Sequence, residues 1–334
     1  MGGGPMTRHV VAGAAAGLLI VLATAGCGAP AVTTPASIGA PSASAAPSVE
    51  QTPAATVRSP APSAGGSPSV IPAFDHIYVV VMENREFDAI VGSRAAPYIN
   101  GLIARYGLAT NYHAVTHPSQ PNYFALFAGT TLGLTDNENH DLAARDLADQ
   151  IDDRGLTWHV YAQDYPGGCS PEASVEGGVD LTGAAGWYVR KHEPAISFTD
   201  ISRRSARCAR ITGLAGFSPT EASFELIIPN MTNDMHDGSV AQGDSFLRSF
   251  VPRILEEPAF ARSLLLITWD EGTTNDGGGG RVATLVIAPS VPRGMRSDRS
   301  HTHYSLLRTI EEAWGLGCLE HSCSANDLRE FFPG

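Results

Sequence analysis

The chain is short of positive charge. Its 22 lysine and arginine residues are outnumbered by 34 aspartate and glutamate residues, giving a formal net charge of -12. An acidic chain is a poor candidate for binding nucleic acid through its overall field, so we expect no nucleic-acid partner. A ligand that carries phosphate would need locally placed positive charge, and a metal cation is the simplest source.

Cysteines are also few, and no two are spaced as Cys-x-x-Cys. That absence disfavours a structural zinc site. Of the five cysteines, Cys27 lies near the N-terminus and the others form an even set. In an exported protein an even set suggests disulfides, and the pairing that closes the shortest loops is Cys169 with Cys208 and Cys318 with Cys323.

The apolar run near the N-terminus is too short to span a bilayer comfortably. It covers residues 10–23 and is followed by Thr24-Ala-Gly-Cys27. This favours a signal peptide over 1–27 rather than an anchor helix. Small residues before a cysteine resemble a bacterial lipobox, although Thr24 stands where leucine is usual. We therefore expect export, with a lipid on Cys27 that attaches the chain to a membrane, and plain secretion as the alternative.

Aromatic residues are missing from the segment that follows. Residues 28–72 are rich in Pro, Ala, Ser and Thr and carry only Glu50 and Arg58 as charges. Such a segment cannot bury a core, so it is predicted to be a disordered linker. The remaining residues, 73–334, are predicted to form a single folded domain.

From residue 73 onward, β-branched apolar runs alternate with segments of helical periodicity. This alternation predicts an α/β fold with a mainly parallel sheet whose strands are buried on both faces. The predicted strands are 77–82, 158–162, 224–228, 264–269 and 283–288. The predicted helices begin at Pro97 or cover 142–154, 244–257 and 304–314.

Polar residues follow several of these strands directly. Glu83-Asn84 follows the first strand, Asn230 follows the strand at 224–228, and Asp270-Glu271 follows the strand at 264–269. Ligands of open α/β sheets bind beyond the carboxyl ends of the strands. Carboxylates gathered there would repel one another unless a cation or proton neutralised them, so we expect a divalent metal. The alternative is that each pair only ends a strand or caps a helix.

Other polar segments could complete a site. Ser119, between two prolines, is expected near a helix start, where the backbone favours an anionic group. Taken alone, Ser119 is better explained as an N-cap. The segments 230–237, 190–192 and 301–303 gather imidazoles, carboxylates and basic groups, with a solvated surface as the alternative for 190–192. The glycine run 277–280 lacks a Gly-Lys-Ser/Thr ending and is interpreted as a flexible loop.

At this point the motifs resemble those of the bacterial phosphoesterase family, which includes acid phosphatases and phospholipases C of the alkaline-phosphatase-like superfamily. The mycobacterial secreted acid phosphatases are the nearest group. The likeness covers about residues 73–316, in order. The matching segments are 74–85, 117–123, 228–237, 268–271 and 303–310. Glu86 departs from the family pattern, in which Ser is common after Glu-Asn-Arg.

The resemblance implies a three-layer α/β/α sandwich of the alkaline-phosphatase type, a catalytic Ser119 and a divalent metal of unspecified identity. It assigns the metal ligands to Glu83, Asn84, Asp270 and Glu271. It assigns the substrate-binding positions to Asn122, His192, Asp234, His236, Asp237 and His303. The expected activity is hydrolysis of phosphomonoesters through a phosphoserine.

Two alternatives stay open. A phospholipase C would act on phospholipid head groups with the same nucleophile and metal. A surface lipoprotein would bind a phosphorylated ligand without turning it over.

Overall fold

The computed structural model describes residues 70–169, 174–179 and 185–333, so the predicted signal peptide and nearly all of the predicted linker lie outside the described residues. An eight-stranded sheet lies at the centre of the fold, in the order β11-β2-β10-β9-β1-β8-β4-β7. Its strands are β1 His76–Met82, β2 Gly107–Ala109, β4 Trp158–Ala162, β7 Ile211–Gly213, β8 Phe224–Ile228, β9 Ser263–Trp269, β10 Thr284–Ile287 and β11 Arg296–Ser297.

The sheet is mainly parallel, as predicted. Strand β1 pairs in parallel with β8 on one side and β9 on the other, and β4 pairs in parallel with β8 and β7. Strand β10 is antiparallel to both of its neighbours, β9 and β2. All five predicted strands are present within two residues of their expected bounds, because each is an apolar run buried on both faces.

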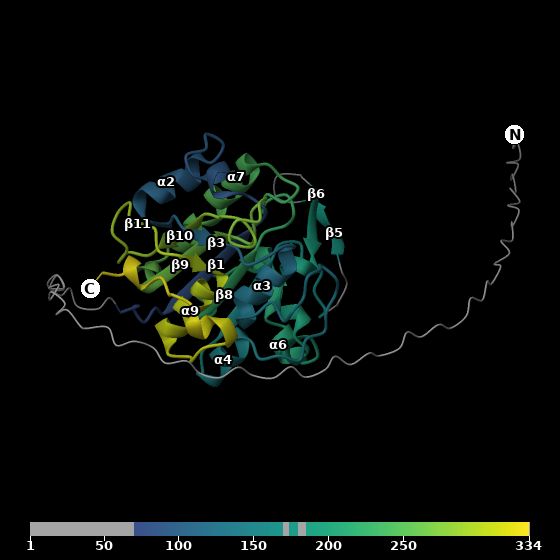
Figure 1. Cartoon of the computed structure of the whole chain (residues 1–334). Coiled ribbons are helices and arrows are strands. Elements are labelled where there is room, and N and C mark those ends of the chain that lie inside the picture. The colour runs from purple at the N-terminus through teal and green to yellow at the C-terminus, as the bar shows by residue number, and fades with distance from the viewer. Residues whose placement is uncertain (1–69, 170–173, 180–184, 334) are drawn as a thin grey trace, which may run out of the picture. The chain divides into compact units, whose positions relative to one another are not determined.

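Helices cover both faces of the sheet (Figure 1). Helices α2 Pro97–Arg105 and α7 Val240–Phe250 contact each other, as do α3 Ser119–Ala128 and α9 His303–Trp314. Figure 1 shows the sheet between these two pairs, which is the predicted three-layer arrangement. The shorter helices are α1 Phe87–Ile90, α4 Leu147–Asp153, α5 Thr199–Ser202, α6 Ser205–Cys208 and α8 Pro252–Leu255.

Two predicted helices have different bounds in the structure. The helix predicted over 142–154 begins only at Leu147, because Asp146 caps it by accepting from the Asp149 N–H and Leu142 instead pairs with backbone at 197–199. The helix predicted over 244–257 begins at Val240, after a Ser239 capping box, and is divided into α7 and α8 before Pro252.

Short elements complete the described part of the chain. Strands β3 Tyr112–His113 and β12 His301–Thr302 form one pair, and β5 Ser174–Val179 and β6 Ala185–Val189 form another. The turn η1, Arg190–His192, follows β6 directly. The predicted disulfides are both present, with Cα–Cα distances of 5.7 Å for Cys169–Cys208 and 5.1 Å for Cys318–Cys323. Within the described ranges, no helix is both long enough and apolar enough to cross a membrane.

Candidate active site

Three neighbouring parallel strands end at one edge of the sheet and deliver the predicted polar residues there. Strand β1 is followed by Glu83 and Asn84, and β9 by Asp270 and Glu271. Strand β8, on the other side of β1, is followed by the turn that carries Asn230. Backbone bonds hold the edge together, because the Glu83 N–H donates to the Asp234 carbonyl and the Asp270 N–H donates to the Met82 carbonyl.

The carboxylates at this edge lie close together and are nearly inaccessible to solvent. One end of the Asn84 carboxamide lies 3.0 Å from Glu83, 3.2 Å from Asp270 and 3.3 Å from Glu271, measured to a carboxylate oxygen in each case. Asp270 Oδ1 accepts from the Asn84 N–H, while Asp270 Oδ2 is buried without a hydrogen-bond partner among the described residues. Four oxygen-bearing side chains thus converge, and their charge is not balanced within the group.

The electrostatic cost of this cluster appears in its pKa values. Burial and the nearby Glu271 charge raise the pKa of Asp270 to about 7. Burial, with Asp270 and Asp234 adding to it, raises the pKa of Glu83 well above its usual range. A cation placed among these oxygens would reverse both effects by favouring the ionised forms.

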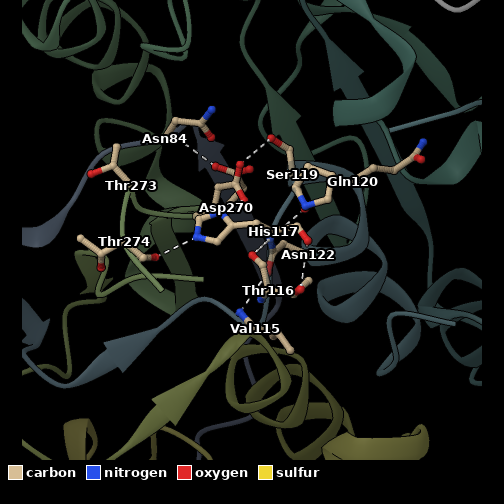
Figure 2. Close-up of polar contacts among 12 residues, drawn as sticks. Asn84, Val115, Thr116, His117, Ser119, Gln120, Asn122, Asp270, Thr273 and Thr274 are labelled. Atoms are coloured by element: carbon tan, nitrogen blue, oxygen red, sulfur yellow. Dashed lines mark hydrogen bonds and ion pairs between the residues drawn. The ribbon is translucent and has the colours of Figure 1, made fainter. Parts of the chain in front are cut away.

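Ser119 is the first residue of α3 and is 1% exposed. Its hydroxyl oxygen lies 3.1 Å from Glu271 Oε1 and 3.3 Å from Glu83 Oε2, and either oxygen can accept its one proton. Figure 2 shows the Ser119 side chain pointing toward Asp270 from the side opposite Asn84. A hydroxyl in this position has acceptors for its proton and lies where the helix dipole favours an anion.

Asn122 braces the loop that carries Ser119. Its Oδ1 accepts from the N–H groups of Val115 and Thr116, and its Nδ2 donates to the carbonyls of Thr116 and Pro118 (Figure 2). These bonds use the full hydrogen-bonding capacity of the carboxamide. The structure therefore brings Asn122 close to the site but directs its side chain to the loop backbone.

His117 was not singled out from the sequence, although it lies in the motif that contains Ser119. Its Nε2 donates to the Thr274 carbonyl at 2.7 Å and its Nδ1 lies 2.6 Å from Glu271 Oε2 (Figure 2). Partial burial alone would lower the pKa of His117, but the Thr274 carbonyl and Glu271 outweigh it and the pKa is raised. A protonated His117 would balance part of the carboxylate charge.

His192 occupies the opposite side of Glu83. Its Nε2 lies 3.2 Å from Glu83 Oε1 and its Nδ1 lies 3.4 Å from Asp234 Oδ2, but neither contact has hydrogen-bond geometry. The ring stacks on Tyr123, whose hydroxyl donates to Glu83 Oε1. Burial, with Lys191 adding to it, lowers the pKa of His192 well below its usual range, so the ring is neutral.

Lys191 is the only lysine in the chain, and it lies beside His192 and His236. Its ammonium is 3.3 Å from His236 Nε2, while His236 Nδ1 is 2.8 Å from an oxygen of the exposed Asp237. The Asp237 carboxylate fixes the proton of His236 on Nδ1, which leaves Nε2 free to accept from Lys191. Asp234, by contrast, is buried and accepts from the His236 N–H.

His303 contacts the backbone of Asp270 rather than its carboxylate. Its Nε2 is 2.5 Å from the Asp270 carbonyl and its Nδ1 is 3.1 Å from the Tyr112 hydroxyl. Burial lowers the pKa of His303 to about 4. Asn230 stabilises its own turn, because its Oδ1 accepts hydrogen bonds from the N–H groups of Thr232 and Asn233.

The prediction of a flexible loop at residues 277–280 is wrong, because the structure packs these glycines closely against the segment before Ser119. A Cβ at Gly278 would lie 2.3 Å from the Val115 carbonyl oxygen, and one at Gly279 would lie 2.4 Å from the Thr116 carbonyl oxygen. Glycine is required there for close approach of two backbones. The glycine run thus supports the Ser119 loop.

Two groups in the described part of the chain have nitrogen or carboxylate atoms within 4.8 Å of one another, as metal binding requires. One is Glu83 with His192 and His236, which adjoins the carboxylate cluster. The other is Asp146 with Asp149 and Asp200. Arg207 forms ion pairs with all three members of the second group, so part of the charge of that group is already compensated.

Known proteins resemble this chain over most of its described length. A model described as the Phosphoesterase family matches residues 93–317. The chain is 35% identical over 275 residues to a phosphatidylinositol-3-phosphatase of Mycobacterium tuberculosis, covering 81% of this chain and 87% of that protein. It is 30% identical over 276 residues to an acid phosphatase of Aspergillus fumigatus, covering 77% of this chain but only 58% of that enzyme. Non-specific phospholipase C1 of Arabidopsis thaliana is 22% identical, over 66% of this chain and 46% of that protein.

Solved structures share the fold at low sequence identity. The phosphonate monoester hydrolase SpPMH of Silicibacter pomeroyi has a TM-score of 0.50 at 11% identity, covering 78% of this chain and 77% of that one. The lipoteichoic acid synthase LtaP of Listeria monocytogenes has a TM-score of 0.51 at 8% identity, covering 73% and 72%. The solved structures show the shared fold alone. The family model and the curated relatives identify the chain as a member of the phosphoesterase family, an enzyme that hydrolyses phosphoric esters.

Proposed function

We propose that the protein is an exported, metal-dependent phosphatase that hydrolyses phosphomonoesters through a phosphoserine on Ser119. One observation carries the proposal. The Ser119 hydroxyl, at the first residue of α3, lies 3.1 Å from Glu271 and 3.3 Å from Glu83, within a converging set of oxygen donors.

The metal would be held by Glu83, Asn84, Asp270 and Glu271. The close approach of the Asn84 carboxamide to three carboxylate oxygens, and the unpartnered Asp270 Oδ2, fit a cation among them. A set made only of oxygen ligands suits hard divalent cations. When bound, such a cation would polarise a phosphoryl oxygen and favour the ionised form of the Ser119 hydroxyl.

In the first step the Ser119 oxygen attacks phosphorus and its proton passes to the carboxylate that it already contacts. The Ser119 O–P bond forms as the bond from phosphorus to the leaving oxygen breaks, and the leaving oxygen takes up the proton from that carboxylate to give the free alcohol. In the second step water attacks the phosphoserine, which releases inorganic phosphate and restores the serine. Most of the rate enhancement would come from positioning and charge neutralisation.

Lys191 and His192 would contact the phosphoryl group, with the Lys191 ammonium supplying positive charge in an acidic chain. His236 and Asp237 would aim that ammonium, as the contact of 3.3 Å between His236 Nε2 and Lys191 supports. Asn122 was predicted to bind phosphate. Because the oxygen and nitrogen of its carboxamide are both fully hydrogen-bonded to the loop backbone, we assign Asn122 to positioning Ser119 instead. His303 is assigned to supporting Asp270 through its carbonyl.

The substrate we favour is a phosphomonoester carried by a phosphoinositide or a similar phosphorylated alcohol. The likeness to a phosphatidylinositol-3-phosphatase over most of both chains supports this choice. A phospholipase C is the second candidate, supported by the more distant likeness to the plant enzyme. Free phosphate released from phosphatidylinositol 3-phosphate supports the phosphatase, whereas diacylglycerol released from phosphatidylcholine supports the phospholipase.

Export is part of the proposal because two disulfides, Cys169–Cys208 and Cys318–Cys323, suit an oxidising compartment. Lipidation of Cys27 would keep the enzyme at a membrane surface. Mass spectrometry of the protein from its own cell envelope tests this: a diacylated N-terminal Cys27 supports anchoring, and a free mature N-terminus favours secretion.

The central test is hydrolysis of a panel of phosphomonoesters and phosphodiesters by Ser119→Ala and by chelator-treated wild type. We expect kcat to fall on the order of 10³-fold or more in Ser119→Ala, with a folded protein by circular dichroism. Ser205→Ala, at the exposed start of α6, is the matched control and should keep full activity. Near-normal turnover in folded Ser119→Ala, or full activity after verified metal removal, would refute the nucleophile or the metal respectively.

A further inference from the structure

Glu86 lies just beyond the metal-ligand segment and reaches across to the loop that follows Glu271. Its Oε1 accepts from the N–H of Thr273 at 2.9 Å and from the N–H of Thr274 at 2.8 Å. A carboxylate that accepts two backbone N–H groups forms strong, charge-assisted bonds. Glu86 therefore fixes the backbone at the start of this loop.

The loop is shaped to receive this carboxylate. A Cβ at Gly272 would lie 2.4 Å from Glu86 Oε1, and the three nearest atoms to it all belong to the Glu86 carboxylate. A Cβ at Gly280 would lie 2.7 Å from the same oxygen. The carboxylate thus fills the space between the two ends of the loop, and the ends are themselves joined by the bond from the Gly272 N–H to the Gly279 carbonyl.

The fixed loop is connected to Ser119 by side chains. The carbonyl of Thr274 accepts from His117 Nε2 at 2.7 Å, and His117 Nδ1 lies 2.6 Å from Glu271 Oε2. The other oxygen of Glu271 accepts from Ser119 at 3.1 Å. Each contact therefore restrains the next, from the Glu86 carboxylate to the Ser119 hydroxyl.

We propose that Glu86 is a positioning residue. Its carboxylate acts as a clamp on the Thr273-Thr274 backbone, so that His117 and Glu271 keep the Ser119 hydroxyl in its reactive orientation. The proposal rests on the proposed function of Ser119. Glu86 itself touches neither the nucleophile nor the predicted metal ligands through these bonds, so its effect should fall on kcat more than on KM. Residues that orient a catalytic group through another residue typically change the activity about 10- to 100-fold when they are substituted.

Three substitutions separate the hydrogen bonds from the charge. Glu86→Ala removes both, and we expect kcat to fall about 10- to 100-fold with KM within about threefold. Glu86→Gln keeps an acceptor oxygen and should recover most of the activity. Glu86→Asp is too short to reach both N–H groups and should resemble Glu86→Ala. The matched control is Glu256→Ala, at the exposed end of α8, which should match the wild type. Equal losses in the Ala and Gln variants would overturn the clamp, because charge alone would then explain them.

A double-mutant cycle with Gly272→Ala gives an independent reading. In the wild type the added methyl displaces the Glu86 carboxylate, so kcat should fall about as far as in Glu86→Ala. In a Glu86→Ala background the methyl enters vacated space, so the second substitution should cost less than about twofold. Additive losses would show that the two residues act separately. If Glu86→Ala does not fold, kcat is compared between Gly272→Ala and Glu86→Gln. A loss in Gly272→Ala with most activity kept in Glu86→Gln supports the proposal, and equal losses overturn it.

Amide hydrogen exchange separates the clamp from the catalytic proposal, because it needs no substrate. The N–H groups of Thr273 and Thr274 should exchange at least about tenfold faster in Glu86→Ala than in the wild type, and close to the wild-type rate in Glu86→Gln. Unchanged exchange in Glu86→Ala refutes the clamp even if the enzyme is active. Faster exchange with unchanged kcat refutes the positioning role. A wild type without phosphatase activity would defeat the proposed function, while exchange would still decide whether Glu86 holds the loop.

Discussion

Without the proposed metal, the stability of this protein should depend on pH in a direction set by Asp270. The Asp270 carboxyl is fully buried, and its pKa rises from 3.8 to about 7 through burial and the Glu271 charge. In the metal-free protein the folded state therefore keeps a proton that the unfolded chain releases above about pH 4. Folded-state stability is unaffected by this group below pH 4 and falls as the pH rises towards 7.

The size of the effect follows from the difference between the two pKa values. A rise from 3.8 to about 7 corresponds to about 4 kcal/mol of unfolding free energy lost between pH 4 and pH 7. A bound divalent cation needs the ionised carboxylate, so its stabilising effect grows over the same interval. Saturating metal should therefore offset most of the loss.

Urea unfolding at pH 4, 5.5 and 7 measures this, with chelator and with a saturating divalent cation. Asp270→Asn is the control, since it keeps the side-chain shape but does not titrate. The difference between wild type and Asp270→Asn isolates Asp270 from the other carboxylates, and we expect it to shift by about 4 kcal/mol across the range without metal. The reasoning is refuted if that difference is constant with pH, or if metal leaves the pH profile unchanged.

Other predictions concern the loop, the disulfides and the lysine. Cys169→Ser with Cys208→Ser should lower the unfolding free energy by about 4 kcal/mol, and removal of Cys318–Cys323 should lower it by about 2 kcal/mol. The difference arises because the disulfides close loops of different length, with sequence separations of 39 and 5. Equal losses measured by urea unfolding would contradict this. Asn122→Ala should cost about 3 kcal/mol and reduce kcat, since it leaves buried N–H groups of the loop unpaired; a fully stable variant would show that the brace is dispensable. Lys191, the only lysine, should be protected from amine acylation by inorganic phosphate, as peptide mapping would reveal. Labelling at Lys191 that is independent of phosphate would exclude it from the binding site.

The sequence predicted the central strands well because burial on both faces leaves a clear signal. Strands β4 and β8 have the predicted bounds, and the polar residues that follow β1 and β9 mark the sheet edge at which the site lies. Helix starts were harder to predict. The first turn of the helix expected over 142–154 is absent because Leu142 pairs with backbone far along the chain, a contact that local periodicity does not encode.

The candidate site was predictable only in part for a related reason. Glu83, Ser119 and Asp270 stand in recognisable motifs at strand or helix ends. The contact of His117 with Thr274, by contrast, joins residues 157 positions apart, and no local sequence pattern predicts it. The glycine run was misread because close packing and flexibility both favour glycine, and only the backbone carbonyls around it distinguish the two.

The reversal of β10 bears on which part of this chain could change in length. Because β10 is antiparallel to β9, the connection over 270–283 leaves and returns to the sheet at the same edge. It therefore needs no crossover helix, and its length can change without moving any strand. Insertions between Asn275 and Asp276, beyond the part held by Glu86, would enter an exposed stretch of the connection and leave β9 and β10 paired as they are. The connection can therefore take up changes in length that the buried strands cannot.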